Sequence, residues 1–280
     1  MPKDGGIGAS SKRREDLRFL TGKGKYTDDM NIHGQAYAYF IRSDVAHGTI
    51  NAIDVSAAEA MPGVELVYTA TDFDGEAMQE PKHPVLAEGK VRHVGDPIAV
   101  VVADSLEEAR DAAEAVEIDI TELEPVLDMK DALAGGATKV HDDLTSNLCY
   151  DWGFVEENRD AVDAAINGAH HVTTLELKNN RLVANPMEPR VAVADYDSST
   201  EEHTLYTTSQ NPHVIRLLMG AFVLGIPEHK LRVVAPDVGG GFGAKIYHYA
   251  EEAFCTFAAK AIGRPVKWTS SRSEAFISDA

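Results

Sequence analysis

Along the chain, segments with the apolar pattern of a β-strand alternate with segments whose apolar residues have helical spacing. Residues 97–103 form an unbroken apolar run, and 105–116 follow with apolar positions at helical spacing. Ser105 and Glu108 have the spacing of a capping box and predict where that helix begins. Ser56 and Glu59 predict a second, shorter helix in the same way. Segments with the composition of strands lie at 35–42, 48–55, 64–70, 97–103 and 117–122.

The pattern resumes after a polar stretch at 133–150, which contains Gly135 and Gly136 and is predicted to be a linker. Residues 71–92 are expected to form a loop, and residues 1–30 a mostly extended arm. The remaining predictions are helices at 160–166, 212–224 and 247–262, and strands at 172–178, 190–196, 203–208, 231–235 and 265–269. We therefore expect an α+β fold with domains at 15–132 and 151–280, preceded by a flexible basic arm at 1–14.

Charge and cysteine content narrow the classes of function. The 280 residues carry a formal net charge of −19, which argues against nucleic acid as a partner, because phosphates require a basic surface. Cys149 and Cys255 are far apart, so neither a disulfide framework nor a metal-ligand cluster is indicated. The longest apolar-rich run, at 217–224, is too short to span a bilayer, and the N-terminus lacks the apolar core of a secretory signal. These features predict a cytoplasmic protein without a membrane span.

The most informative segment is the glycine loop, which we define as residues 239–245, between a predicted strand and a predicted helix. Its sequence is Gly-Gly-Gly-Phe-Gly-Ala-Lys. Such a loop lets backbone N–H groups approach an anionic ligand closely. A nucleotide-binding P-loop is excluded, because Ala244 and Ile246 stand where that motif needs glycine and a hydroxyl residue. A dinucleotide fingerprint of an NAD(P)-dependent dehydrogenase stays open, since Gly239, Gly241 and Ala244 match it.

Further motifs accompany the loop in a fixed order. They are Arg13-Arg14-Glu15-Asp16, Arg18-Phe19-Leu20-Thr21-Gly22, Tyr26-Thr27-Asp28-Asp29, Met187-Glu188-Pro189-Arg190 and Ser209-Gln210-Asn211-Pro212-His213. Together with the loop they resemble the molybdenum-cofactor-binding large subunit of the molybdenum hydroxylases, a family that includes aerobic carbon monoxide dehydrogenase, xanthine dehydrogenase and aldehyde oxidase. The resemblance covers essentially the whole chain. It implies an α/β hammerhead domain at 15–132 and the first part of a mixed α/β molybdopterin-binding domain at 151–280.

The resemblance also implies roles for particular residues. Gln210 would donate its amide N–H to an oxo ligand of molybdenum, and the pterin sulfurs rather than protein side chains would hold the metal. Gly240, Gly241, Phe242 and Gly243 would lie against the cofactor, with Phe242 lining the substrate channel. No catalytic residue is expected in this chain, because the family's general base lies in a C-terminal region beyond these residues. Lys245 is expected either to contact anionic cofactor groups or to be exposed.

The function that the resemblance implies is hydroxylation of a carbon centre with oxygen from water. The substrate would be that of a carbon monoxide dehydrogenase-like enzyme or of an aldehyde or N-heterocycle dehydrogenase. The expected cofactor is a molybdenum-pterin, as molybdopterin cytosine dinucleotide. The expected partners are an iron–sulfur small subunit with [2Fe–2S] clusters, a medium subunit with FAD, and a second large subunit or its missing half. Without these the chain would be inactive. The alternative is a non-catalytic remnant or assembly module.

A chain ending at this point is also expected to leave apolar faces uncovered. Val266, Trp268 and Phe276 are predicted to be exposed, because later strands of the family would ordinarily cover them.

Overall fold

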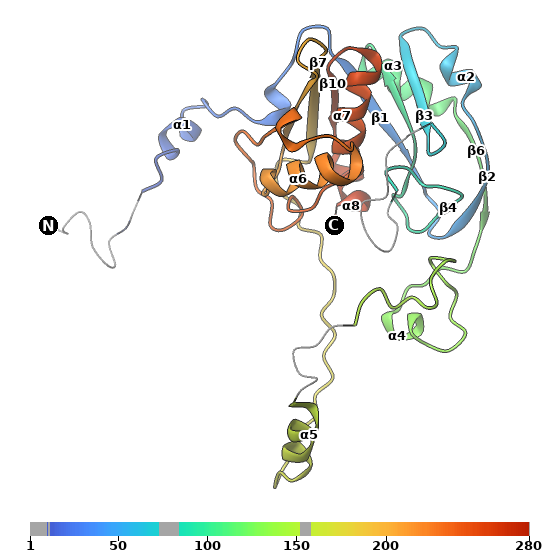
Figure 1. The fold of residues 1–280 in the computed structure, drawn as a ribbon, viewed down its shortest axis with the longest axis vertical. Helices are drawn as coiled ribbons and strands as arrows, with labels where there is room; N and C mark the ends of the chain where they lie inside the picture. Colours follow the sequence, from blue (N-terminus) through green and yellow to red (C-terminus); the bar gives the residue numbers. More distant parts are fainter. Residues whose placement is uncertain (1–9, 11, 73–83, 152–157, 280) are drawn as a thin grey trace, which may run out of the picture.

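The computed structural model describes residues 10, 12–72, 84–151 and 158–279. A seven-stranded mixed sheet forms the body of the protein (Figure 1). Four of its six pairings are antiparallel, whereas β1–β10 and β8–β9 are parallel. A doubly wound dinucleotide-binding sheet is mostly parallel, so the sheet does not fit the dehydrogenase alternative. Across the sheet the strands are β3 (Val64–Thr69), β5 (Pro97–Ala103), β1 (Ala36–Arg42), β10 (Val266–Thr269), β7 (Val191–Asp197), β8 (Glu202–Thr207) and β9 (Leu231–Val234).

Strand β10 lies in the middle of this sheet although it comes last in the sequence. It pairs with β1 on one side and with β7 on the other. Val266 and Trp268 are therefore buried, and the prediction that they would be exposed was wrong. Phe276, on the following helix α8 (Arg272–Ser278), is 51% exposed, as expected.

Helices cover both faces of the sheet. Helix α7 (Ala250–Ile262) packs on one face, and α2 (Ser56–Glu59) and α3 (Leu106–Glu114) pack on the other. Successive side chains of β5 point to opposite faces of the sheet. Because both faces are covered, all seven residues of β5 are buried. Val100 and Val102 belong to the core beneath α7, whereas Val101 belongs to the core beneath α3.

A smaller three-stranded sheet completes the N-terminal part. Its order is β4 (Lys90–Val91), β2 (Gly48–Asp54) and β6 (Glu117–Glu122). A separate small core around Val91 and Ile98 supports it. Strand β4 falls within the segment predicted to be a loop, where two residues are too few to show a strand pattern.

The predicted strand at 172–178 is absent. Helix α5 (Arg159–Asn167) forms as predicted, but no helix or strand follows it until β7, and this region extends away from the sheets (Figure 1). Leu175 and Leu177 are 75% and 80% exposed. An alternating pattern makes a strand only when a neighbouring strand bonds its backbone groups, and no strand of the described residues pairs with this segment.

The helix boundaries test two capping predictions. Ser105 Oγ accepts a hydrogen bond from Glu108 N at 3.2 Å, as predicted. The short helix predicted from Ser56 and Glu59 is present as α2, but the capping role of Ser56 was wrong, because its backbone N–H and its hydroxyl both donate to Asp54 Oδ1.

The remaining helical elements are short. The segment predicted to be extended contains two of them, α1 and η1, and the predicted flexible arm at 1–14 lies mostly outside the described residues. The predicted helix at 212–224 is an α-helix, α6, continued by one π-helical turn, η3. Among the described residues, no helix has the length and apolarity required to cross a bilayer. The bounds are α1 (Asp16–Leu20), η1 (Thr27–Asp29), α4 (Met129–Ala132), α6 (Pro212–Leu218), η3 (Met219–Val223) and η4 (Glu228–Lys230).

Candidate cofactor-binding site

The segment at Gln210 and the glycine loop lie in direct contact. Gln210 follows β8 and precedes α6, and its Oε1 accepts hydrogen bonds from Gly243 N at 3.1 Å and Lys245 N at 3.3 Å. The backbone N–H of Gln210 donates to Lys245 O at 2.8 Å. Residues separated by more than thirty positions in the sequence are therefore in direct contact, as a shared cofactor site would require.

At two positions of the loop, the structure shows why the residue is glycine. A Cβ on Gly241 would lie 2.5 Å from Gln210 Cδ, so only glycine allows the glutamine side chain to pack this closely. Gly243 has a backbone φ of +100°, a value that residues with a side chain rarely adopt. Phe242 also has positive φ, at +51°, which is a strained conformation for an aromatic residue. Strain of this kind is characteristic of ligand-binding loops.

The arrangement leaves a row of hydrogen-bond donors without acceptors. Among the described residues, no acceptor bonds to the backbone N–H of Gly240, Gly241 or Phe242, nor to Nε2 of Gln210. Gln210 is exposed, and the Phe242 ring beside it is 78% exposed. Converging N–H groups bind anions rather than cations. The donor set therefore fits the anionic oxygen, sulfur or phosphate groups of a metal–pterin cofactor, and it would not ligate a bare metal ion.

A buried ion pair lies at the base of the loop. Glu188 Oε2 accepts from Gly239 N at 2.6 Å and from Lys245 Nζ at 2.9 Å. The Lys245 side chain is fully buried, so the expectation that it would be exposed was wrong. Burial lowers the pKa of Lys245, and the charge of Glu188 opposes that effect. The motif Met187-Glu188-Pro189-Arg190 signalled this position, but its contact with the loop was not predicted.

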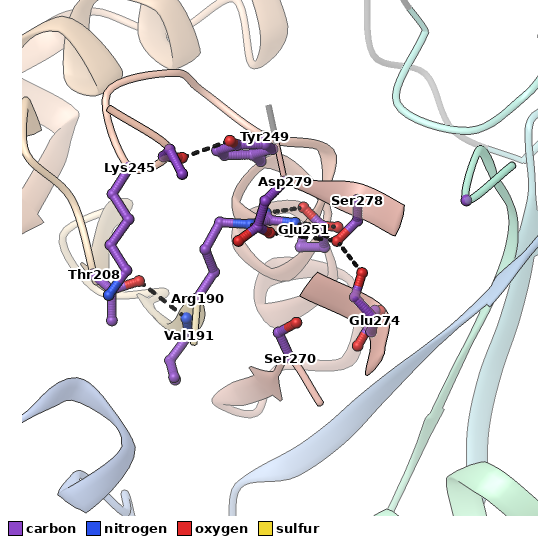
Figure 2. Close-up of polar contacts among 12 residues, drawn as sticks. Arg190, Val191, Thr208, Lys245, Tyr249, Glu251, Ser270, Glu274, Ser278 and Asp279 are labelled. Carbon is purple, nitrogen blue, oxygen red and sulfur yellow. Dashed lines mark hydrogen bonds and ion pairs between the residues drawn. The ribbon is translucent and has the colours of Figure 1, made fainter. Parts of the chain in front are cut away.

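Behind the loop, Tyr249 connects it to a second buried charged group. Tyr249 Oη donates to Ala244 O at 2.5 Å, and the ring stacks on Arg190, whose Cζ lies 3.7 Å from the ring centroid. Arg190 in turn donates to Glu251 and Asp279 at 2.7 Å each (Figure 2). The sequence analysis included Arg190 in a motif without predicting these contacts and did not single out Tyr249; the stacking of the two residues joins positions far apart in the sequence.

Two adjacent glutamates of α7 are buried and have opposite pKa shifts. Burial would raise the pKa of Glu251, but Arg190 and Arg42 outweigh it and hold that pKa below its usual range. Glu252 forms no ion pair among the described residues, and burial raises its pKa to about 7, although hydrogen bonds from the Thr207 hydroxyl and Tyr249 N and the charge of Arg190 act in the opposite direction.

Comparison with known proteins supports the assignment of both parts of the chain. Residues 21–124 match the a/b hammerhead domain of aldehyde oxidase and xanthine dehydrogenase, and residues 140–280 match the molybdopterin cofactor-binding domain. The exact domain limits stay a prediction.

Individual relatives agree over nearly the whole chain. The large subunit of nicotine 6-hydroxylase from Paenarthrobacter nicotinovorans is 37% identical, over 96% of this chain and 34% of that protein. The carbon monoxide dehydrogenase large chain of Afipia carboxidovorans is 36% identical, over 96% of this chain and 35% of that protein. Among solved structures, quinoline 2-oxidoreductase from Pseudomonas putida 86 superposes with a TM-score of 0.84 at 36% identity, over 98% of this chain and 36% of that chain.

The chain spans about a third of the length of these relatives. Its family models, relatives and structural neighbours agree with the observed fold. The chain belongs to the family of molybdenum-cofactor-binding large subunits of the molybdenum hydroxylases, and comprises a hammerhead domain followed by molybdopterin-binding sequence.

Proposed function

We propose that this chain supplies the amide donors that hold the anionic ligands of a molybdenum-pterin cofactor in a carbon-hydroxylating oxidoreductase. The observation that carries the proposal is the contact between Gln210 and the glycine loop, which brings three free backbone N–H groups and one side-chain amide together. When bound, the cofactor would supply the two-electron oxidation and the oxygen-transfer chemistry. The chain's own residues bind and orient it.

The roles of these residues follow from their hydrogen-bonding capacity. Gln210 already uses Oε1 to hold the loop, so its Nε2 is the atom left to donate to an anionic ligand of the metal. An amide donates without ionising, so its hydrogen bond does not change with pH. Gly240, Gly241 and Phe242 would donate backbone N–H groups, Gly243 would keep the loop in place against Gln210, and the exposed Phe242 ring would line the approach of the substrate.

The rest of the enzyme would come from other polypeptide segments. As partners we propose an iron–sulfur subunit, an FAD subunit, and a second large subunit or the remaining large-subunit sequence. The cofactor would be molybdopterin cytosine dinucleotide, and the complex would be located in the cytoplasm. The general base would lie outside these residues, so the chain alone would be inactive. The relatives that oxidise nicotine and carbon monoxide leave an N-heterocycle, an aldehyde or carbon monoxide as candidate substrates.

Metal analysis of the assembled complex tests the proposal. The complex purified after co-expression with its partner polypeptides should contain molybdenum and a pterin. Gly241→Ala should lower the molybdenum content several-fold, because the added Cβ would displace Gln210. Gly135→Ala is the matched control, since a Cβ there meets nothing within 4 Å. A wild-type complex without molybdenum would refute the proposal, and a molybdenum-loaded complex without turnover would indicate an assembly module.

A further inference from the structure

We propose that Glu188 and Lys245 form a buried clamp that sets the conformation of the glycine loop, so both are positioning residues for its amide donors. The importance of the clamp for catalysis rests on the proposed function, whereas its existence as a structural device does not. Neither residue needs to touch the cofactor for this role.

The geometry shows how one carboxylate controls the whole loop. A single oxygen, Glu188 Oε2, accepts from Gly239 N at the first residue of the loop and from Lys245 Nζ at the last. The Glu188 backbone N–H also donates to Gly239 O at 3.3 Å. A Cβ on Gly239 would lie 2.5 Å from Glu188 Cβ, so the contact requires glycine at this position. The two ends of the loop are therefore held at one point.

Burial makes this attachment costly to break. The Lys245 side chain is 0% exposed and the Glu188 side chain 10% exposed. Removing one member of such a pair leaves the other charge in the interior without a counter-charge, which destabilises strongly. The other carboxylate oxygen, Glu188 Oε1, is buried without a hydrogen-bond partner among the described residues, so Oε2 alone holds the loop.

The clamp acts on the donors because they lie between its two attachment points. Gly240, Gly241 and Phe242, whose N–H groups are free, come after Gly239 and before Lys245. Gln210 and Tyr249 support the C-terminal side of the loop through Gly243 and Ala244. On the N-terminal side, the described contacts of the first loop residue are those with Glu188. Loss of the clamp should therefore release the donor residues from that side.

Hydrogen–deuterium exchange of the full 280-residue chain, without cofactor, tests the clamp directly. Glu188→Gln and Lys245→Met should each speed exchange of the hydrogen-bonded backbone amides of the loop, at positions 239, 243 and 245, at least tenfold. The double variant Glu188→Gln/Lys245→Met should speed exchange no more than the stronger of the two single variants, because the two residues act on the loop through their contact with each other.

Lys267→Met is the matched control. Lys267 is also a buried lysine, but its Nζ donates to Asp28 O and Met30 O rather than to any residue of the loop. This variant should destabilise the fold without speeding exchange of the loop selectively.

These measurements test the clamp independently of the proposed function. Equal effects of Lys245→Met and Lys267→Met on the loop would show general destabilisation and overturn the clamp. Fully additive effects of the two substitutions in the double variant would also overturn it, because the two residues would then act independently. Since no cofactor takes part, a negative result here leaves the molybdenum measurement as an independent test of the proposed function.

Discussion

Buried charged residues are concentrated directly behind the glycine loop. Arg190 is almost completely buried and stacks between the rings of Tyr249 and Trp268, with its Cζ 3.7 Å and 5.1 Å from their centroids. Its guanidinium donates to both Glu251 and Asp279, which satisfies a charge that would otherwise be very unfavourable in the interior. A planar, permanently charged side chain suits this place, because it can stack and hydrogen-bond at the same time.

Glu252 should make the stability of the protein depend on pH. Its pKa is raised by burial from 4.5 to about 7, so the folded state binds its proton more tightly than the unfolded state does. The resulting stabilisation is complete below about pH 4.5 and is lost as pH rises through about 7. A shift of this size corresponds to roughly 3 kcal/mol at most. The free energy of unfolding, measured by urea denaturation from pH 5 to 8, should therefore fall less steeply in Glu252→Gln than in the wild type.

The control for this prediction is Glu202→Gln, which changes an exposed glutamate at the start of β8. Its pH profile should match that of the wild type. Parallel profiles for the wild type and Glu252→Gln would show that Glu252 does not titrate differently in the folded state.

Among the elements, α7 links the sheet to the glycine loop. Its apolar residues pack on the sheet, and Glu252, in its first turn, accepts from the backbone N–H of Tyr249. Tyr249 then donates from its hydroxyl to Ala244 O in the loop. The position of the loop therefore depends on where α7 packs.

Tyr249→Phe should separate this hydrogen bond from the stacking. Phenylalanine keeps the ring on Arg190 but leaves Ala244 O without its donor, which should cost about 1 kcal/mol in the free energy of unfolding. It should also speed exchange of the loop amides. Tyr247→Phe, at a side chain that is 58% exposed, should change neither quantity. Equal stability of the two variants in urea would contradict a role for the Tyr249 hydroxyl.

At the scale of the whole molecule, one sheet contains strands from both sides of the predicted linker. Strands β3, β5 and β1 come from the hammerhead part and β10, β7, β8 and β9 from the molybdopterin-binding part, joined where β1 pairs with β10. Phe40 of β1 packs with its ring centroid 5.6 Å from that of Phe254 and 6.0 Å from that of Trp268. Arg42 adds ion pairs to Glu251 and Glu274.

The two parts should therefore unfold in a single cooperative transition. Circular dichroism follows all the secondary structure, whereas in a Trp152→Phe variant fluorescence comes only from Trp268, in the central strand. Because the parts share a sheet and a core, both signals should change at the same denaturant concentration. Two separated transitions would show that the β1–β10 pairing does not couple the parts.

Local sequence patterns predicted most of the individual elements. The unbroken apolar run of β5 and the capping residues of α3 depend only on neighbours in the chain, and both formed where predicted. Gln210 and the glycine loop were found through their motifs. The contact between them agrees with that expectation, although their roles toward a cofactor remain a proposal.

Tertiary structure decided what depends on residues far apart in the sequence. The pattern at 172–178 is that of a strand, but no strand in the described part of the chain lies beside it to complete its hydrogen bonds. Trp268 is buried because its strand inserts between β1 and β7, which no local pattern specifies. Likewise, Lys245 is buried because Glu188, 57 positions away, provides its counter-charge. The sequence by itself determined local conformation and the presence of the motifs, whereas strand order and the pairing of buried charges arose only when the folded chain brought distant residues together.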